Sequence, residues 1–88
     1  MESNEIFIGR KSAINYVLTC SIMSKEHNEI YLRARGDNIS KAVDVALIFT
    51  NRFVLNFKVA GIEINTQTFE TEGNPRNVSV MNICLRKI

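Results

Sequence analysis

The pattern of hydrophobic and polar positions predicts a strand and a helix in the first third of the chain. Ile6-Phe7-Ile8 is a short apolar run that ends at Gly9, as is typical of a strand. Apolar residues then recur at three- and four-residue spacing, which indicates one side of an amphipathic helix. These positions are Ile14, Val17, Leu18, Ser21 and Ile22. Ser12 is placed to cap this helix, and the polar residues 25–28 end it.

The middle of the chain predicts a second strand and a second helix. Residues 29–35 alternate strictly, and such alternation sends successive side chains to opposite faces of a sheet. The first face takes Ile30, Leu32 and Ala34, and the second takes Tyr31, Arg33 and Arg35. After Gly36, a helix is predicted from residues 38–40 to about Val54.

This second helix has two apolar stripes. The first consists of Val43, Ala46, Leu47 and, at the end, Val54; the second consists of Val45, Ile48 and Phe49. One stripe is enough to pack a helix on a sheet. The second stripe therefore indicates either a wide core or a contact with another subunit.

The last third predicts two long strands. Residues 57–69 are rich in β-branched side chains and are expected to bend near Gly61. Gly73-Asn74-Pro75 predicts a turn, and residues 78–88 carry apolar side chains on both faces. The order βαβαββ predicts a two-layer α/β (α+β) fold, in which two helices pack on a four-stranded mixed sheet and the last hairpin forms an extended arm.

Composition limits the class of protein. The chain has 88 residues, which suits one domain over residues 1–88, with 45% hydrophobic and 23% charged residues. So short a domain buries only about 60–65% of its unfolded surface, and a partner subunit would add to its stability. No apolar stretch has the length of a membrane span, so we expect a soluble intracellular protein with no membrane partner.

The sequence lacks a recognisable catalytic or metal-binding constellation. Its only histidine is His27, and Cys20 and Cys84 lie far apart, which favours free thiols in a reducing compartment. No paired carboxylates, P-loop or dinucleotide motif stands out. We therefore expect no enzymatic activity, cofactor, metal or small-molecule substrate.

Charge placement is more informative than the net charge, which is only +2. Gly9-Arg10-Lys11-Ser12 leads into the first helix, and residues 33–41 lead into the second. Each segment places cations beside a helix N-terminus, where free N–H groups already favour anions such as phosphate. Successive strand-to-helix loops can share one edge of a sheet. The alternative is an ordinary solvated basic surface.

Three separated motifs resemble those of the Alba family. Residues 6–11 with Asn15-Tyr16-Val17-Leu18 resemble the opening of Alba proteins. Ala34-Arg35-Gly36 with residues 39–44 resembles the family's most recognisable motif, and Asn51-Arg52-Phe53 resembles the end of its second helix. The resemblance runs from about residue 5 to residue 88. Alba proteins are small archaeal dimers that coat DNA and also bind RNA, with little sequence preference.

The resemblance implies roles for particular residues. Arg10 and Lys11 would form the central phosphate-contacting pair, flanked by Arg35 and Arg33, with Asn38 and Lys41 as lesser contacts. The hairpin from Thr68 to Val78, with Arg76, would reach toward a minor groove. The second helix and late strands would build the dimer, in agreement with the second stripe of Val45, Ile48 and Phe49. Neighbouring dimers would meet at Asn51, Arg52 and Phe53.

Some positions depart from the family's pattern. Arg10 stands where the family has its acetylatable lysine, Asp37 where many members have arginine, and Glu70 and Glu72 make the arm acidic. Asp37 is expected to cap the second helix, to repel phosphate, or to do both, since the two effects are compatible. These changes indicate weaker or different DNA binding than that of a typical member.

The sequence thus predicts a non-enzymatic dimer that binds double-stranded DNA without sequence preference, compacts chromatin in the archaeal nucleoid, and also binds RNA. Two alternatives stay open. One is an RNA-binding subunit of a ribonucleoprotein, and the other is a heterodimer partner that tunes a more basic Alba paralogue.

Overall fold

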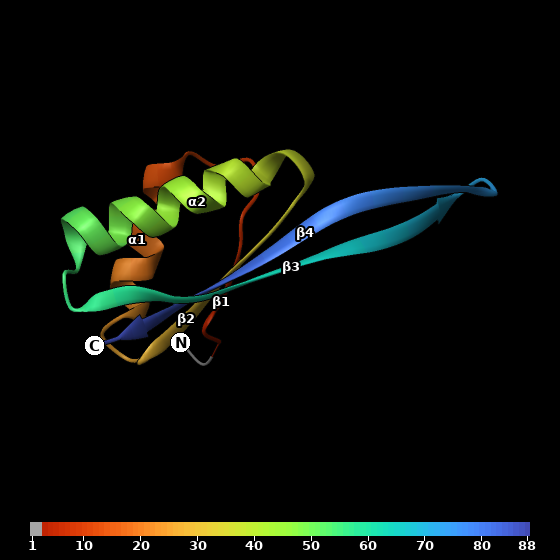
Figure 1. Cartoon of the computed structure of the whole chain (residues 1–88). Coiled ribbons are helices and arrows are strands. Elements are labelled where there is room, and N and C mark those ends of the chain that lie inside the picture. Colours follow the sequence, from red (N-terminus) through yellow and green to blue (C-terminus); the bar gives the residue numbers. More distant parts are fainter. Residues whose placement is uncertain (1–2) are drawn as a thin grey trace.

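Two helices cover one face of a four-stranded sheet in the computed structural model, which describes residues 3–88 (Figure 1). A 3-10 turn at Gly36–Asn38 precedes the second helix, and one π-helical turn at Phe49–Phe53 follows it. The predicted element order is confirmed. The strands and helices are β1 (Glu5–Phe7), α1 (Ala13–Met23), β2 (Glu29–Arg35), α2 (Ile39–Ile48), β3 (Phe57–Thr71) and β4 (Asn74–Lys87).

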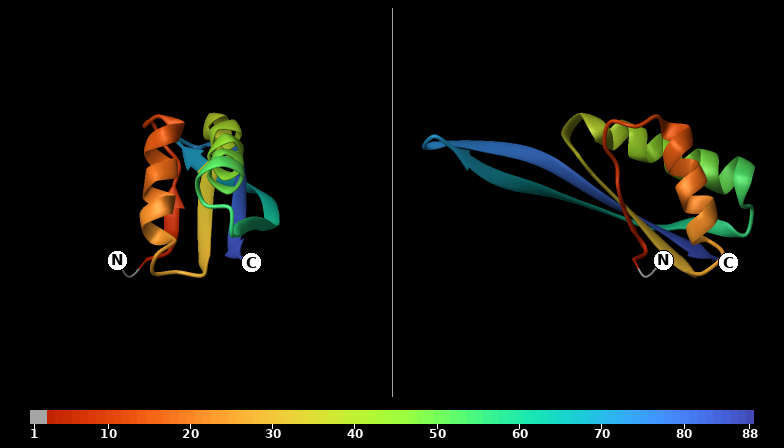
Figure 2. Two further views of the ribbon diagram at one scale, coloured as in Figure 1. Left: turned by 90° about the vertical axis from the view of Figure 1, so that its left-hand side faces the viewer. Right: turned by 180° about the vertical axis from the view of Figure 1, so that it is seen from behind.

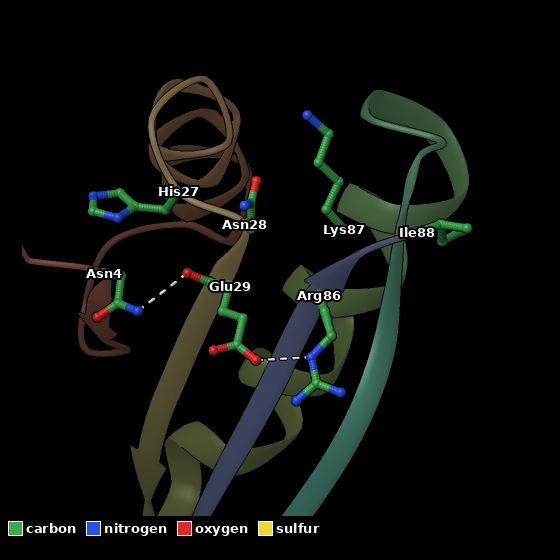
Figure 3. A pocket seen from close by; sticks show the side chains of 7 residues that line it. All are labelled: Asn4, His27, Asn28, Glu29, Arg86, Lys87 and Ile88. Carbon is green, nitrogen blue, oxygen red and sulfur yellow. Dashed lines mark hydrogen bonds and ion pairs between the residues drawn. The ribbon is translucent and has the colours of Figure 1, made fainter.

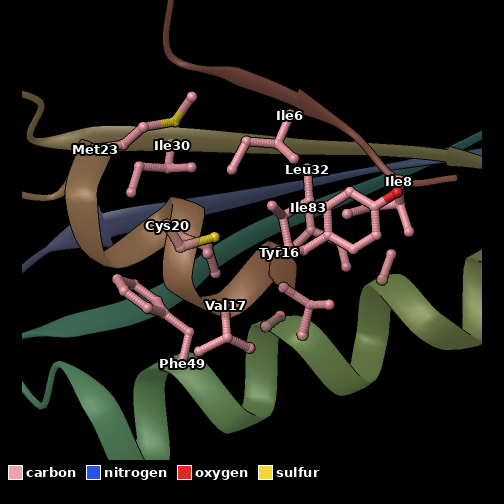
Figure 4. Packing of buried hydrophobic residues seen from close by; sticks show 14 of the residues in the cluster. Ile6, Ile8, Tyr16, Val17, Cys20, Met23, Ile30, Leu32, Phe49 and Ile83 are labelled. Carbon is pink, nitrogen blue, oxygen red and sulfur yellow. The ribbon is translucent and has the colours of Figure 1, made fainter. Parts of the chain in front are cut away.

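The sheet is mixed, as predicted. Its strand order is β1-β2-β4-β3, with β1 parallel to β2 and β4 antiparallel to both β2 and β3. The alternation in β2 also holds, because Ile30 and Leu32 are buried beneath the helices (Figure 4) and Ala34 is buried as well. Tyr31, Arg33 and Arg35 consequently lie on the opposite, open face of the sheet.

Helix α1 buries Val17 of the predicted stripe but is otherwise turned relative to the prediction. Its core residues are Tyr16, Val17, Cys20 and Met23 (Figure 4). Ile14, Leu18 and Ile22 are exposed. The spacing alone fits both stripes. The rotation of the helix follows from Tyr16, whose ring enters the core while its hydroxyl accepts hydrogen bonds from the backbone of the preceding loop. Burial raises the pKa of the Cys20 thiol to about 12, and both cysteines are free.

Helix α2 also corrects the prediction. Val45 and Phe49 of the second stripe are completely buried within the protomer, together with Ala42 and Ala46, so neither side chain is left uncovered for a subunit contact. The aromatic ring of Phe49 packs edge-on against that of Phe57, with the ring centroids 5.4 Å apart. Ile48 is only partly buried. Leu47, assigned to the core stripe, is exposed.

Strands β3 and β4 form an arm that extends beyond the helices, so that the molecule measures 46 × 23 × 22 Å (Figures 1 and 2). A register shift between Val59 and Gly61 matches the expected bend. The turn is tighter than predicted, because its central residues are Glu72 and Gly73, both with positive φ. Such two-residue turns suit the right-handed twist of a hairpin, and Asn74 and Pro75 therefore already belong to β4.

The described part of the chain, residues 3–88, contains no helix long and apolar enough to cross a membrane. The same residues bring together no cluster of three or more His, Cys, Asp or Glu side chains that could hold a metal ion.

Candidate nucleic-acid interface

The two basic loops lie side by side at one end of the sheet. Because β1 and β2 are parallel, the two strands finish at the same end of the sheet, and the loop that leads into a helix starts there in each case. Arg10 from the first loop and Arg35 and Asn38 from the second line one hollow of about 620 Å³. The sequence-based expectation that the loops share an edge is therefore met.

The backbone of the first loop is held from two sides. The Tyr16 hydroxyl accepts hydrogen bonds from the N–H groups of Gly9 (2.8 Å) and Lys11 (3.3 Å). The Lys41 ammonium donates to the carbonyl oxygens of Gly9 (2.6 Å) and Lys11 (2.9 Å). The side chains of Arg10 and Lys11 remain exposed. Their cationic groups are thus carried on a backbone whose position is set by α1 and α2.

Lys41 is expected from the sequence to be a lesser phosphate contact, but in the structure its ammonium group binds backbone carbonyls. Its side chain is partly buried, and two of its three N–H donors already bind backbone carbonyls. Its main structural role is to join the start of α2 to the first loop. A positioning role for this lysine could not be read from its spacing in the sequence.

Arg33 and Arg35 lie on the open face but in different electrostatic surroundings. Arg33 Nη2 forms an ion pair with Glu5 Oε1 at 2.8 Å, and Arg33 Nη1 donates a hydrogen bond to Asn82 Oδ1 at 3.5 Å. Its charge is therefore partly compensated. The exposed Arg35 guanidinium instead lies 5.3 Å from the centroid of the Phe69 ring, a cation–π contact between the end of β2 and the arm.

Neither Ser12 nor Asn38, at the N-cap positions of α1 and α2, makes a side-chain capping hydrogen bond. The expectation that Ser12 caps α1 in this way is therefore wrong. Asp37 is exposed within the 3-10 turn, and no hydrogen bond of its carboxylate is found among the described residues. Capping therefore does not account for Asp37, which leaves its negative charge facing solvent beside Arg35.

The remaining predicted site residues lie elsewhere. Arg76 is exposed on the arm, where it pairs with Phe69 across the hairpin. Asn51, Arg52 and Phe53 form the exposed part of the π-helical turn after α2, at the opposite end of that helix from the basic loops. The fold thus does not bring these four residues into the cluster of Arg10, Lys11 and Arg35.

A second hollow, of about 580 Å³, lies at the other end of β2 (Figure 3). There Arg86 Nε contacts Glu29 Oε2 at 2.7 Å, and Asn4 donates a hydrogen bond to the Glu29 carbonyl oxygen. The hydrogen bond from Arg86 lowers the pKa of the Glu29 carboxyl. Because Glu29 and Arg86 compensate each other, the lining of this hollow carries less net positive charge than that of the hollow at the basic loops.

Three exposed apolar side chains were missed by the sequence reasoning. Helix α2 covers β2 and β4 but leaves the outer strand β3 open (Figure 2). Ile62 and Ile64 on the helix side of β3 are 60% and 70% exposed, and Phe7 on the open face is 71% exposed. The alternation of isoleucine with Glu63 in β3 is the signal that could have identified the first two.

Comparisons with known proteins agree with this geometry. The sequence model of the Alba family matches residues 4–70. A protein of Thermoplasma acidophilum named DNA/RNA-binding protein Alba is 40% identical over 87 residues, which cover 98% of each chain. DNA/RNA-binding protein Alba 1 of Archaeoglobus fulgidus is 39% identical over 99% of each chain. The solved structure of Alba from Thermoplasma volcanium superposes with a TM-score of 0.87, 40% identity and coverage of 96% of this chain and all of that one.

Proposed function

The chain belongs to the Alba family, and on this premise we propose that it is a non-enzymatic protein that binds nucleic acid through backbone phosphates, with double-stranded DNA as its main ligand. Relatives that cover almost the whole chain are named DNA/RNA-binding proteins. In this role the protein coats and compacts the chromosome within the cytoplasm of an archaeal cell.

The observation that carries this proposal is the clamped loop that presents Arg10 and Lys11. Its backbone is held by Tyr16 and Lys41, so little loop ordering is required on binding. Arg35 adds a third exposed cation from the neighbouring loop. Cations on two neighbouring loops neutralise phosphates and release counterions without reading bases.

The test is a titration of duplex DNA at several salt concentrations. If about 4–6 phosphates are neutralised per dimer, log K should fall against log salt with a slope of roughly −4 to −5. In the double variant Arg10→Ala/Lys11→Ala, the affinity should fall at least several-fold and the slope should become shallower, because two phosphate contacts are lost. Both side chains are exposed, so the fold should be retained.

A matched control removes two charges from the opposite end of the sheet. Lys25 and Lys87 are also exposed, and Lys25→Ala/Lys87→Ala lowers the net charge equally. This control should reduce affinity much less than the loop variant. Equal effects of the two variants, or a wild-type affinity that does not respond to salt, would contradict the assignment.

We also propose that the protein acts as a dimer, built on the uncovered strand β3 and the outer side of α2. Ile62 and Ile64 are exposed apolar side chains on the helix side of β3, and Met81, which pairs with Ile64, is only partly buried. Helix α2 adds the exposed Leu47 and the partly buried Ile48. A second copy that covers these residues would remove apolar surface from water. Asn51, Arg52 and Phe53 are proposed as the contact between neighbouring dimers, since they form a separate exposed turn.

The arm favours RNA as a second ligand. Its tip carries Glu70 and Glu72 against Arg76, which is unfavourable for entry into the negatively charged minor groove of DNA. The wide, shallow minor groove of A-form RNA is contacted by shape and through 2′-hydroxyls and needs less basic charge. A ribonucleoprotein subunit is therefore the second candidate function. The same titration with duplex RNA would favour it if RNA binds more tightly than DNA at equal salt.

A further inference from the structure

Phe7 is an exposed aromatic side chain that neither the core nor the proposed duplex contacts use. Its neighbours Ile6 and Ile8 are buried, and the alternation of β1 sends Phe7 to the open face, where it pairs in register with Arg33. The described helices both pack on the other face (Figure 2). At 71% exposure, a phenyl ring on this strand contributes little to folding.

The ring lies at the edge of a groove with a distinctive lining. This groove is the hollow of about 620 Å³ between the basic loops and the base of the arm. Three arginines, Arg10, Arg33 and Arg35, share it with three side-chain amides, which belong to Asn38, Gln67 and Asn82. Among the described residues that line it, none is a carboxylate.

We propose that this groove binds an unpaired nucleotide, whose base stacks on Phe7 while its phosphate contacts Arg10 or Arg35. Aromatic rings stack on the faces of all bases. The Asn82 amide already donates to Glu63 and accepts from Arg33. The amides of Asn38 and Gln67 remain to donate and accept hydrogen bonds, as the edges of bases require. The inference rests on the proposed nucleic-acid binding and adds the position at which an unpaired base of single-stranded DNA or single-stranded RNA would stack.

Stacking on Phe7 distinguishes single strands from duplexes. In a duplex, each internal base is already stacked on both sides and paired, so its face is not available without unstacking energy. Phosphate contacts by Arg10 and Lys11 serve both forms equally. The contribution of Phe7 should therefore appear mainly in the affinity for single strands.

The experiment uses the full chain and four ligands of equal length: oligo-dT, oligo-U, duplex DNA and duplex RNA. The sequence has no tryptophan, so Phe7→Trp introduces a sole indole into the groove. Its emission, excited at 295 nm, should be quenched by the single strands at saturation and much less by the duplexes. Quenching by duplexes to the same extent would overturn the proposal.

A second variant measures the energetic contribution. Phe7→Ala should weaken binding of the single strands about tenfold, as expected for loss of one stacked base, and should weaken duplex binding less. Ile22→Ala is the matched control, because Ile22 is 62% exposed on α1, in the other layer of the molecule, and its replacement should change no affinity. If Phe7→Ala lowers the affinities for oligo-dT and oligo-U equally, stacking alone explains the binding. If the wild-type protein binds oligo-U more tightly than oligo-dT, the groove also contacts the 2′-hydroxyl.

The controls separate this inference from the proposed function. If duplexes bind with the expected salt slope but Phe7→Ala leaves single-strand affinity unchanged, the stacking proposal is wrong and the proposed function stands. If the wild-type chain binds neither duplexes nor single strands, both are wrong. Circular dichroism of Phe7→Ala identifies unfolding, and in that case Phe7→Leu, which keeps an apolar side chain without an aromatic face, must show the same loss for the proposal to hold.

Discussion

Asp37 places a negative charge in the loop that otherwise presents cations. Its carboxylate is exposed and caps no helix by a hydrogen bond, so its effect is expected to be electrostatic. A single repulsion of a phosphate across solvent is worth about 1 kcal/mol at most near physiological salt. At low salt, where screening weakens, this repulsion should be measurable.

We predict that Asp37→Arg tightens duplex DNA binding by up to about fivefold at low salt, with a gain that shrinks as salt rises. Because no capping hydrogen bond is lost, the melting temperature should change little. Asp44→Arg makes the same charge change more than one turn further along α2 and should gain less. Equal gains from both variants would show that net charge, rather than position in the loop, controls affinity.

At the scale of an element, the arm depends on a turn whose first central residue is unfavourable. Glu72 has a φ of 53°, in the left-handed region, and Gly73 follows with a φ of 80°. Glycine adopts such angles freely, whereas a residue with a Cβ pays about 1–2 kcal/mol. Asparagine tolerates this region better, and Asn-Gly is the preferred pair for such hairpin turns.

Glu72→Asn should therefore order the tip of the arm. We expect amide hydrogen exchange at residues 68–77 to slow by about two- to fivefold, which corresponds to roughly 0.5–1 kcal/mol. The melting temperature should hardly change, because the tip lies outside the core. Glu70→Gln removes the same charge without altering the turn, and it should leave the exchange rates as they are. Slowing by both variants would point to charge instead of backbone conformation.

At the scale of the whole molecule, the helices cover the strands of the sheet unequally, and this is relevant to how two copies of the chain would associate. Helix α2 leaves β3 open, so that Ile62 and Ile64 face solvent in the single protomer. Isolated exposed apolar residues are common, but neighbouring ones on one face typically mark a contact with another protein. A second copy of the chain is the partner proposed for this face.

We predict that Ile64→Glu converts the dimer to a monomer at micromolar concentration, because it would place a carboxylate in an apolar contact. Ile64 is 70% exposed in the protomer, so the protomer itself should stay folded. Ile22→Glu, at a similarly exposed position on α1, should remain a dimer. Sedimentation velocity distinguishes these states. A wild-type chain that sediments as a monomer throughout would refute the proposed interface, as would an unchanged Ile64→Glu dimer.

Local pattern was sufficient for the element order, the mixed two-layer fold and the family. The bounds of β2 coincide with the strictly alternating residues 29–35. The same alternation also assigns its apolar side chains to the buried face and its polar side chains to the open face. The two basic loops also follow from the sequence, because glycines and cations precede both helices. Each of these features depends on neighbours in the chain, and they are therefore visible without three-dimensional information.

The tertiary structure alone decided which helix faces are buried and which basic residues are available to a ligand. Helix α1 has two stripes of suitable spacing, and the choice of Tyr16 and Cys20 over Leu18 depends on a hydrogen bond between Tyr16 and the loop. Lys41 and Lys11 look alike in sequence, yet one clamps the loop that presents the other. The reason is physical: burial and charge compensation depend on groups distant in sequence, and here Lys41 Nζ reaches a carbonyl 32 residues away.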